Sequence, residues 1–120
     1  MTHQELFAHG FKGLRENWQL GLSAMIEAEE MAAKLGDSWN AASYAKMSAH
    51  SLRRYVGFEE ALEAMERAIL YRPDDATFYE AAGHMCFPDR IEQAVGYYRR
   101  GAALGCATCK LLSEGLSRVQ

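Results

Sequence analysis

The chain has 120 residues, of which 49% are hydrophobic and 24% charged, and its formal net charge is −3. This length predicts a single domain with little room for a separate catalytic domain. No apolar stretch approaches the roughly 18 residues of a membrane span, so we expect no membrane partner. The negative net charge argues against binding of nucleic acids or anionic membranes.

The N-terminal sequence MTHQELFAHGF lacks the basic start and apolar core of a signal peptide, so we expect a cytoplasmic protein. The three cysteines are Cys86, Cys106 and Cys109. An odd number of cysteines in a reducing compartment argues against a disulfide framework.

The first half of the chain predicts three helices. Thr2 and Glu5 have the spacing of a capping box, which begins the first helix. The second helix begins at Trp18 and ends before Gly36. Asp37 or Ser38 caps a third helix, whose expected buried stripe is poor in large side chains: Ala41, Ala45, Ser48, Ala49, Leu52 and Val56.

Four more helices are predicted in the second half. One runs from Phe58 to about Tyr71 and ends at Pro73, and the next begins after Asp75 and ends before Pro88. For the sixth helix we expect a second capping box, formed by Asp89 and Glu92, and an end near Gly105. The seventh runs from Cys106 to about Ser117 as a terminal cap, and its expected buried residues are Leu111, Leu112 and Leu116.

These helices carry a repeat. Ala49 and Gly83 are 34 residues apart, and the text GFEEALEAMERAI recurs, altered, as DRIEQAVGYYRRGA. This pattern resembles the tetratricopeptide repeat family, and the tail EQAVGYYRRGAALG is more similar to the related Sel-one-like repeats. The resemblance covers about residues 20 to 118. In the middle unit it depends on Ser48, Ala49, Leu52, Ala61, Met65, Ala68 and Pro73.

The resemblance implies an all-α fold, a right-handed α-α superhelix of about three helical hairpins with a C-terminal capping helix. The units span about residues 3–36, 38–72 and 75–104, the cap spans 106–117, and together they form one domain over 1–120. In this family the first helix of each hairpin lines a concave groove that binds a peptide or protein. Apolar residues on more than one side of each hairpin agree with such stacking.

The family's groove positions correspond to residues on two of the predicted helices. They are Ser43, Lys46, His50, Arg53 and Arg54 in the middle unit, and Thr77, Glu80, His84 and Phe87 in the third. We therefore expect a non-enzymatic adaptor or chaperone-like protein that holds a peptide or protein partner. The basic side chains of the middle unit would suit an acidic segment. The simpler alternative is that these basic side chains only solvate an exposed helix face.

Other kinds of site are less favoured. His84, Cys86, Cys106 and Cys109 have the stoichiometry of a zinc site, but residues two apart on a helix point about 200° apart. We expect no metal and no cofactor. The acidic clusters are typical of solvated helix faces with i,i+4 pairs such as Glu63 with Arg67, so we expect no enzyme. Their members are Glu27, Glu29, Glu30, Glu59, Glu60, Glu63 and Glu66.

Self-association is a second hypothesis. A short repeat array has open ends, which favour stacking of copies. A homodimer would form through exposed apolar residues of the N-terminal unit, such as Phe7, Phe11 and Trp18.

Overall fold

The computed structural model describes residues 1–118, and within them all secondary structure is helical. All seven predicted helices are present. Their bounds are α1 (His3–Gly13), α2 (Trp18–Lys34), α3 (Ser38–Tyr55), α4 (Phe58–Tyr71), α5 (Ala76–Cys86), α6 (Ile91–Ala103) and α7 (Ala107–Ser117). Across residues 1–118, no helix is both long enough and apolar enough to cross a bilayer.

The helices form two compact units. The first unit, Met1–Arg72, contains α1 to α4, and the second begins at Pro73 and contains α5 to α7. Pro73 lies directly after the C-cap of α4, where the missing backbone N–H prevents a further helical turn.

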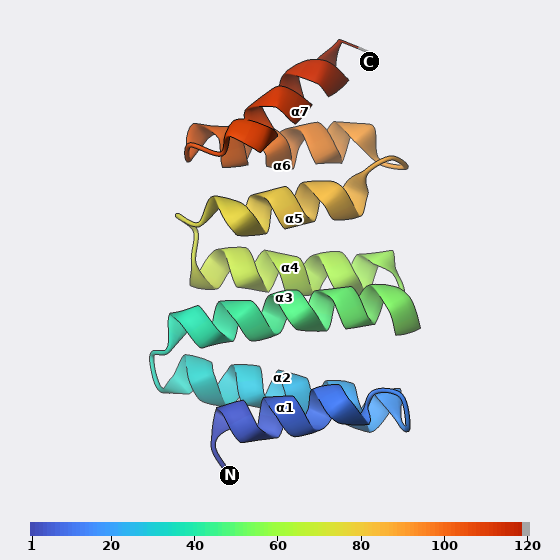
Figure 1. Cartoon of the computed structure of the whole chain (residues 1–120), viewed down its shortest axis with the longest axis vertical. Coiled ribbons are helices and arrows are strands. Elements are labelled where there is room, and N and C mark those ends of the chain that lie inside the picture. The colour runs from blue at the N-terminus through green and yellow to red at the C-terminus, as the bar shows by residue number, and fades with distance from the viewer. Residues whose placement is uncertain (119–120) are drawn as a thin grey trace. The chain divides into compact units, whose positions relative to one another are not determined.

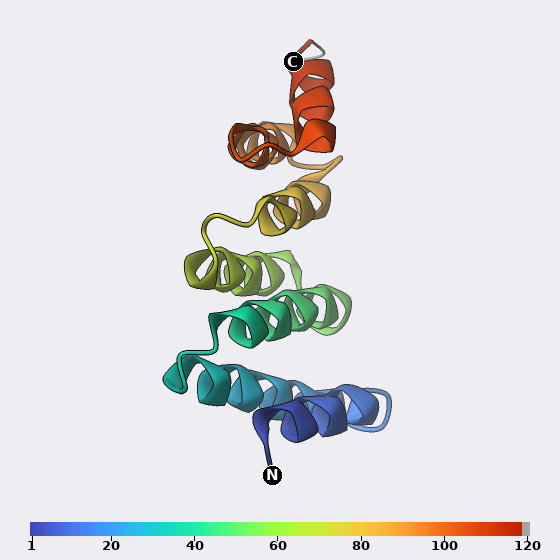
Figure 2. The same ribbon diagram turned by 60° about the vertical axis from the view of Figure 1, so that its left-hand side comes forward.

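In the first unit, α1 to α4 lie in layers that follow the order of the chain (Figures 1 and 2). The capping box of Thr2 and Glu5 is confirmed, because each side chain accepts a hydrogen bond from the backbone N–H of the other residue. The side chains of Asn17 and Asp37 cap α2 and α3 by accepting hydrogen bonds from the backbone N–H groups of Leu20 and Asn40. Short connections between the end of one helix and the N-cap of the next place consecutive helices side by side.

Two glycines allow α1 and α2 to approach each other closely. A Cβ atom on Gly21 would lie 2.7 Å from the carbonyl oxygen of Gly10, and a Cβ on Gly10 would lie 2.7 Å from that of Gly21. Neither glycine could carry a side chain without a shift of backbone. The hairpin therefore packs backbone against backbone at this point.

The core of the first unit joins α1 to α3. Phe7 stacks on Tyr44 with ring centroids 4.3 Å apart, and Tyr44 Oη lies 2.9 Å from His3 Nδ1. Both aromatic residues are buried together with apolar side chains of α2. The N-terminal helix thus packs in cis within this chain, and the expectation that Phe7 is exposed is wrong.

Glu29 corrects the interpretation of the acidic clusters. Its side chain is only 2% exposed, and it accepts hydrogen bonds from Arg67 Nε at 2.8 Å, Arg67 Nη2 at 3.1 Å and Tyr71 Oη at 2.9 Å. Arg67 therefore makes a bidentate ion pair across to α2. The hydrogen bonds of Arg67 go to Glu29, whereas the predicted partner Glu63 on the same helix acts on the guanidinium through its charge, which helps to raise the pKa of Arg67.

In the second unit, α6 packs between α5 and α7. The Tyr98 ring lies directly against Gly83 of α5, where a Cβ atom would clash with it. On the other side, Gly101 leaves room for Cys109 of α7, because a Cβ at Gly101 would lie 2.7 Å from Cys109 Sγ. Small residues again let helices pack closely.

Three sequence predictions of local structure are wrong. The N-cap of α6 is Arg90, without a side-chain cap, because the backbone N–H of Arg90 bonds to Cys86 O and closes the turn one residue later than Asp89. Leu111 is 72% exposed, since α7 turns Cys109 and Ser113 toward the interior instead. Val56 is exposed at the C-cap of α3, where the regular helical stripe has ended.

Candidate functional site

The first unit has a groove between α1 and α3, which we call the basic groove. It has a volume of about 420 Å³. Its walls come from the C-terminal end of α1 and the C-terminal half of α3. The lining residues are Phe11, Leu14, Arg15, Met47, His50, Ser51, Arg54 and Tyr55.

Stacked rings support both ends of the basic groove. Phe11 is 46% exposed and stacks on the buried Phe7 with centroids 6.3 Å apart. Tyr55 stacks almost parallel on Trp18 at 5.8 Å, and the Arg54 guanidinium lies 5.5 Å from the centroid of the Tyr55 ring. The rings of Phe11 and Tyr55 in the groove are therefore held in place by the rings on which they stack.

The polar rim of the basic groove is cationic. Arg15 and Arg54 line it directly, and Lys46 and Arg53 flank His50 on α3. Partial burial lowers the pKa of His50 below its usual value, and repulsion from Lys46 and Arg53 lowers this pKa further. His50 is therefore protonated less readily than a free histidine side chain.

Two of the five predicted residues of the middle unit, His50 and Arg54, line the basic groove. Lys46 and Arg53 lie next to His50 on α3 without lining the groove, and Ser43 is half-buried one turn before Lys46. Phe11 and Arg15 form the opposite wall. Phe11 was expected in a dimer contact instead, and Arg15 was not predicted, because it lies in the turn after α1 and its position depends on the packing of α1 against α3.

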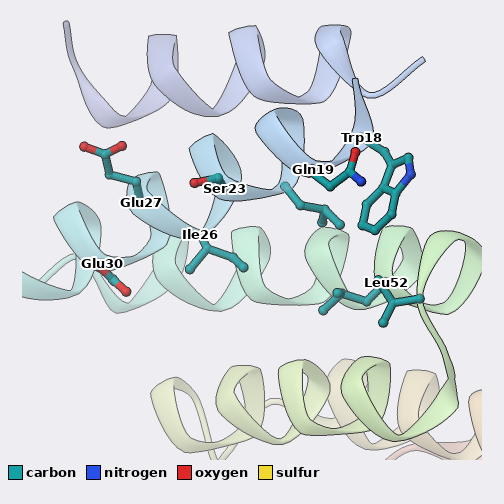
Figure 3. Close-up of a pocket in the computed structure, with 9 residues that line it drawn as sticks. Trp18, Gln19, Ser23, Ile26, Glu27, Glu30 and Leu52 are labelled. Atoms are coloured by element: carbon teal, nitrogen blue, oxygen red, sulfur yellow. The ribbon is translucent and has the colours of Figure 1, made fainter. Parts of the chain in front are cut away.

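A second hollow of about 470 Å³ lies between α2 and α3 of the first unit, and we call it the acidic groove. Figure 3 shows Trp18 and Leu52 at one end of it and Glu27 and Glu30 at the other, with Ile26 between them. Its lining is mainly apolar. Trp18 is half-buried here rather than free for a dimer contact.

The predicted groove residues of the second unit lie along α5. The backbone N–H of Thr77 bonds to the N-cap residue Asp75, and Phe87 is exposed at the C-cap. Glu80 and His84 lie one turn apart on this helix, with Glu80 Oε2 3.3 Å from His84 Nε2. These two side chains belong to a polar cluster with residues of α6 and α7.

The polar cluster contains thiols, a carboxylate, an imidazole and a phenol. Cys106 Sγ donates to Glu80 Oε1 at 3.4 Å and accepts the backbone N–H of Cys109 at 3.1 Å. His84 Nδ1 lies 2.7 Å from Tyr98 Oη. Burial raises the pKa of the Cys109 thiol to about 12, with the hydrogen bond to Cys106 as the second cause, and burial also raises the pKa of Tyr98 to about 12.

His84, Cys86, Cys106 and Cys109 have the stoichiometry of a zinc site in the sequence, but they do not form one group in the structure. Cys86 is buried in the core, and its place in the cluster is taken by Glu80. The signal for Glu80 was its i,i+4 spacing to His84, which places both on one face of α5.

Comparison with models of known protein families and with curated proteins found no match.

Proposed function

We propose that this protein is a non-enzymatic, tetratricopeptide-like binding module, an adaptor or chaperone-like protein whose basic groove holds an acidic segment of a partner. The observation that carries this proposal is the composition of the groove, in which exposed apolar surface is bordered by fixed positive charge. The consecutive helical hairpins of the first unit are consistent with such an architecture.

The expected partner has an apolar anchor next to carboxylates. Phe11, Met47 and Tyr55 offer apolar surface, and Tyr55 and Phe11 are already ordered by stacking, so their contact costs little conformational entropy. Arg15 and Arg54 can each donate charge-assisted hydrogen bonds to a carboxylate. The two kinds of contact together favour an acidic peptide over a neutral or basic one.

Selection from a library of random displayed peptides tests the proposal. We expect the full chain to enrich peptides with Asp or Glu beside an aliphatic or aromatic residue, and we would measure a fluorescein-labelled selected peptide by anisotropy. Arg54→Glu should weaken its binding about tenfold or more, because a lost hydrogen bond to a charged group costs about 1.5–3 kcal/mol.

The matched control is Lys34→Glu, which makes the same charge change at an exposed site at the end of α2, outside the basic groove. Its effect should stay within about twofold, because an exposed charge at a distance is screened. Enrichment of basic peptides, or equal weakening by both variants, would contradict the proposed site.

The pH dependence of peptide binding provides another prediction. His50 begins with a lowered pKa in the free protein, and a peptide carboxylate beside it should raise that pKa in the complex. Binding then takes up a proton, so affinity should increase as the pH falls through the pKa of the complex and level off below the pKa of the free protein. Anisotropy titrations above about pH 5, where the peptide carboxylates stay ionised, measure this.

His50→Gln should make the affinity nearly independent of pH over the same range, since histidine is the side chain whose usual pKa lies there. A wild-type affinity that falls on acidification would argue against a carboxylate next to His50.

The homodimer hypothesis has less support. Of its three proposed contact residues, Phe7 is buried against Tyr44 and Trp18 stacks on Tyr55, which leaves Phe11. Light scattering coupled to size exclusion distinguishes the two proposals: a mass near 13.4 kDa at all concentrations is expected for a peptide-binding monomer. A stable dimer abolished by Phe11→Glu would favour self-association instead.

A further inference from the structure

The first turn of α7 and one face of α5 bring three metal-binding side chains together in the second unit. Glu80, Cys106 and Cys109 each offer one ligand atom, and these atoms lie within 4.8 Å of one another. We propose that the two thiolates and the carboxylate bind one zinc ion. This site is independent of the basic groove.

The donor types fit zinc. Thiolate and carboxylate are both established zinc ligands, with Zn–S near 2.3 Å and Zn–O near 2.0–2.2 Å. Two thiolates disfavour calcium and magnesium, which select oxygen ligands. Binding would release the protons of both thiols. The two thiolates and the carboxylate then neutralise the two positive charges of the ion and leave the site with one net negative charge.

The distances require little rearrangement. In a tetrahedral site with these bond lengths, a sulfur and an oxygen ligand lie about 3.5 Å apart, and two sulfurs about 3.8 Å apart. Cys106 Sγ and Glu80 Oε1 are already separated by 3.4 Å. The two sulfurs are within 4.8 Å, so a small rotation of the half-buried Cys106 side chain closes the site.

The fold positions both thiols. Gly105, at φ 98°, makes the turn after α6, so that Cys106 becomes the N-cap of α7 and Cys109 lies in its first turn. The backbone N–H of Cys109 donates to Cys106 Sγ, which holds that sulfur at the N-terminus of α7 beside Glu80. Gly101 provides the space that Cys109 Sγ occupies, as described above.

Further side chains hold the carboxylate. Tyr98 Oη lies 2.7 Å from His84 Nδ1, and His84 Nε2 lies 3.3 Å from Glu80 Oε2, which leaves Oε1 directed to Cys106. Hydrogen-bonded support of this kind is typical of ligating carboxylates. Three protein ligands leave the fourth position of a tetrahedral ion open to a water molecule.

The test uses the full chain, reduced and stripped of metal with a chelator. Titration with Zn²⁺ against a chromophoric chelator should show one saturable site. Titration with Co²⁺ should produce a thiolate-to-cobalt charge-transfer absorption, which reports sulfur ligation directly. Zn²⁺ should also protect Cys106 from alkylation.

Variants identify the ligands. Cys106→Ser and Glu80→Gln replace residues that are only half-buried, and each should weaken Zn²⁺ binding at least tenfold with the helical circular dichroism unchanged. His84→Gln should weaken it about 10–100-fold, the range for residues that support a ligand. Cys86→Ala, the third cysteine of the same unit, should keep the zinc affinity and the cobalt absorption.

Three results would overturn the proposal. They are the absence of saturable Zn²⁺ binding by the wild type, equal loss in Cys86→Ala and Cys106→Ser, and full zinc affinity in Glu80→Gln. The last result would show that the carboxylate is not a ligand.

Discussion

Replacement of Arg67 by methionine is expected to lower the free energy of unfolding of the first unit by about 3–5 kcal/mol. Arg67 donates two hydrogen bonds from its guanidinium to the carboxylate of Glu29, a residue that is only 2% exposed. Without Arg67, only the Tyr71 hydroxyl still bonds to that carboxylate. A buried charge without its counter-ion is one of the largest single penalties in a folded protein.

Urea unfolding followed by tryptophan fluorescence measures this effect in the relevant unit, because both tryptophans, Trp18 and Trp39, belong to the first unit. The double variant Glu29→Met, Arg67→Met should recover most of the loss, since it removes the buried charge as well as its partner. Arg53→Met, at an exposed position on α3, is the matched control and should change the stability by less than about 0.5 kcal/mol.

A loss below about 1 kcal/mol in Arg67→Met would mean that water reaches Glu29 when the arginine is absent. A double variant as unstable as the single variant would mean that Arg67 contributes by packing and not by charge.

Gly21→Ala is expected to destabilise the first unit by about 1–3 kcal/mol. The new Cβ would lie 2.7 Å from the carbonyl oxygen of Gly10 and 2.9 Å from Leu14 Cδ2. The carbonyl belongs to a helix backbone and cannot rotate away, so α1 and α2 must separate. Because α1 forms one wall of the basic groove, the same variant should also weaken peptide binding.

Gly13→Ala is the control for this prediction. It is the last residue of α1, the helix against which Gly21 packs, and a Cβ there would meet nothing within 4 Å. An alanine should stabilise an unobstructed helical position by roughly 0.5–1 kcal/mol. Chemical unfolding of the two variants should therefore give changes of opposite sign, and a Gly21→Ala variant as stable as Gly13→Ala would contradict the close contact of α1 with α2.

Helix positions were predictable because their signals are local. Thr2, Asn17, Asp37 and Asp75 each cap the helix that follows them, and Pro73 follows the end of α4. A cap and a break act within a few residues, so the sequence contains all the needed information.

Burial and pairing of charges were not predictable from the same local signals. Glu29 lies in the text EAEE, where its neighbours Glu27 and Glu30 are exposed, and nothing in that segment distinguishes the one glutamate that meets Arg67. The prediction of which face of α7 is buried was wrong for a similar reason. Leu111 and Leu112 are apolar and suggest burial, but the space beside Gly101 is filled by Cys109.

The candidate sites were predictable in part. The side of the basic groove formed by α3 follows from the helical spacing of His50 and Arg54, whereas the side formed by α1 depends on how two helices pack. Likewise, Cys106 and Cys109 are seen to lie three residues apart in the sequence, but their approach to Glu80 depends on how α5 and α7 each pack against α6.

Helix α3 borders both grooves of the first unit, and its Tyr55 in the basic groove stacks on Trp18 in the acidic groove. The two rings form a common wall. A ligand that displaces Tyr55 must also change the surface that Trp18 offers on the other side. Where a ligand in one groove changes the affinity of the other groove through this ring pair, thermodynamic linkage requires the reverse effect to have the same factor. The two binding equilibria would be coupled within a single unit of four helices.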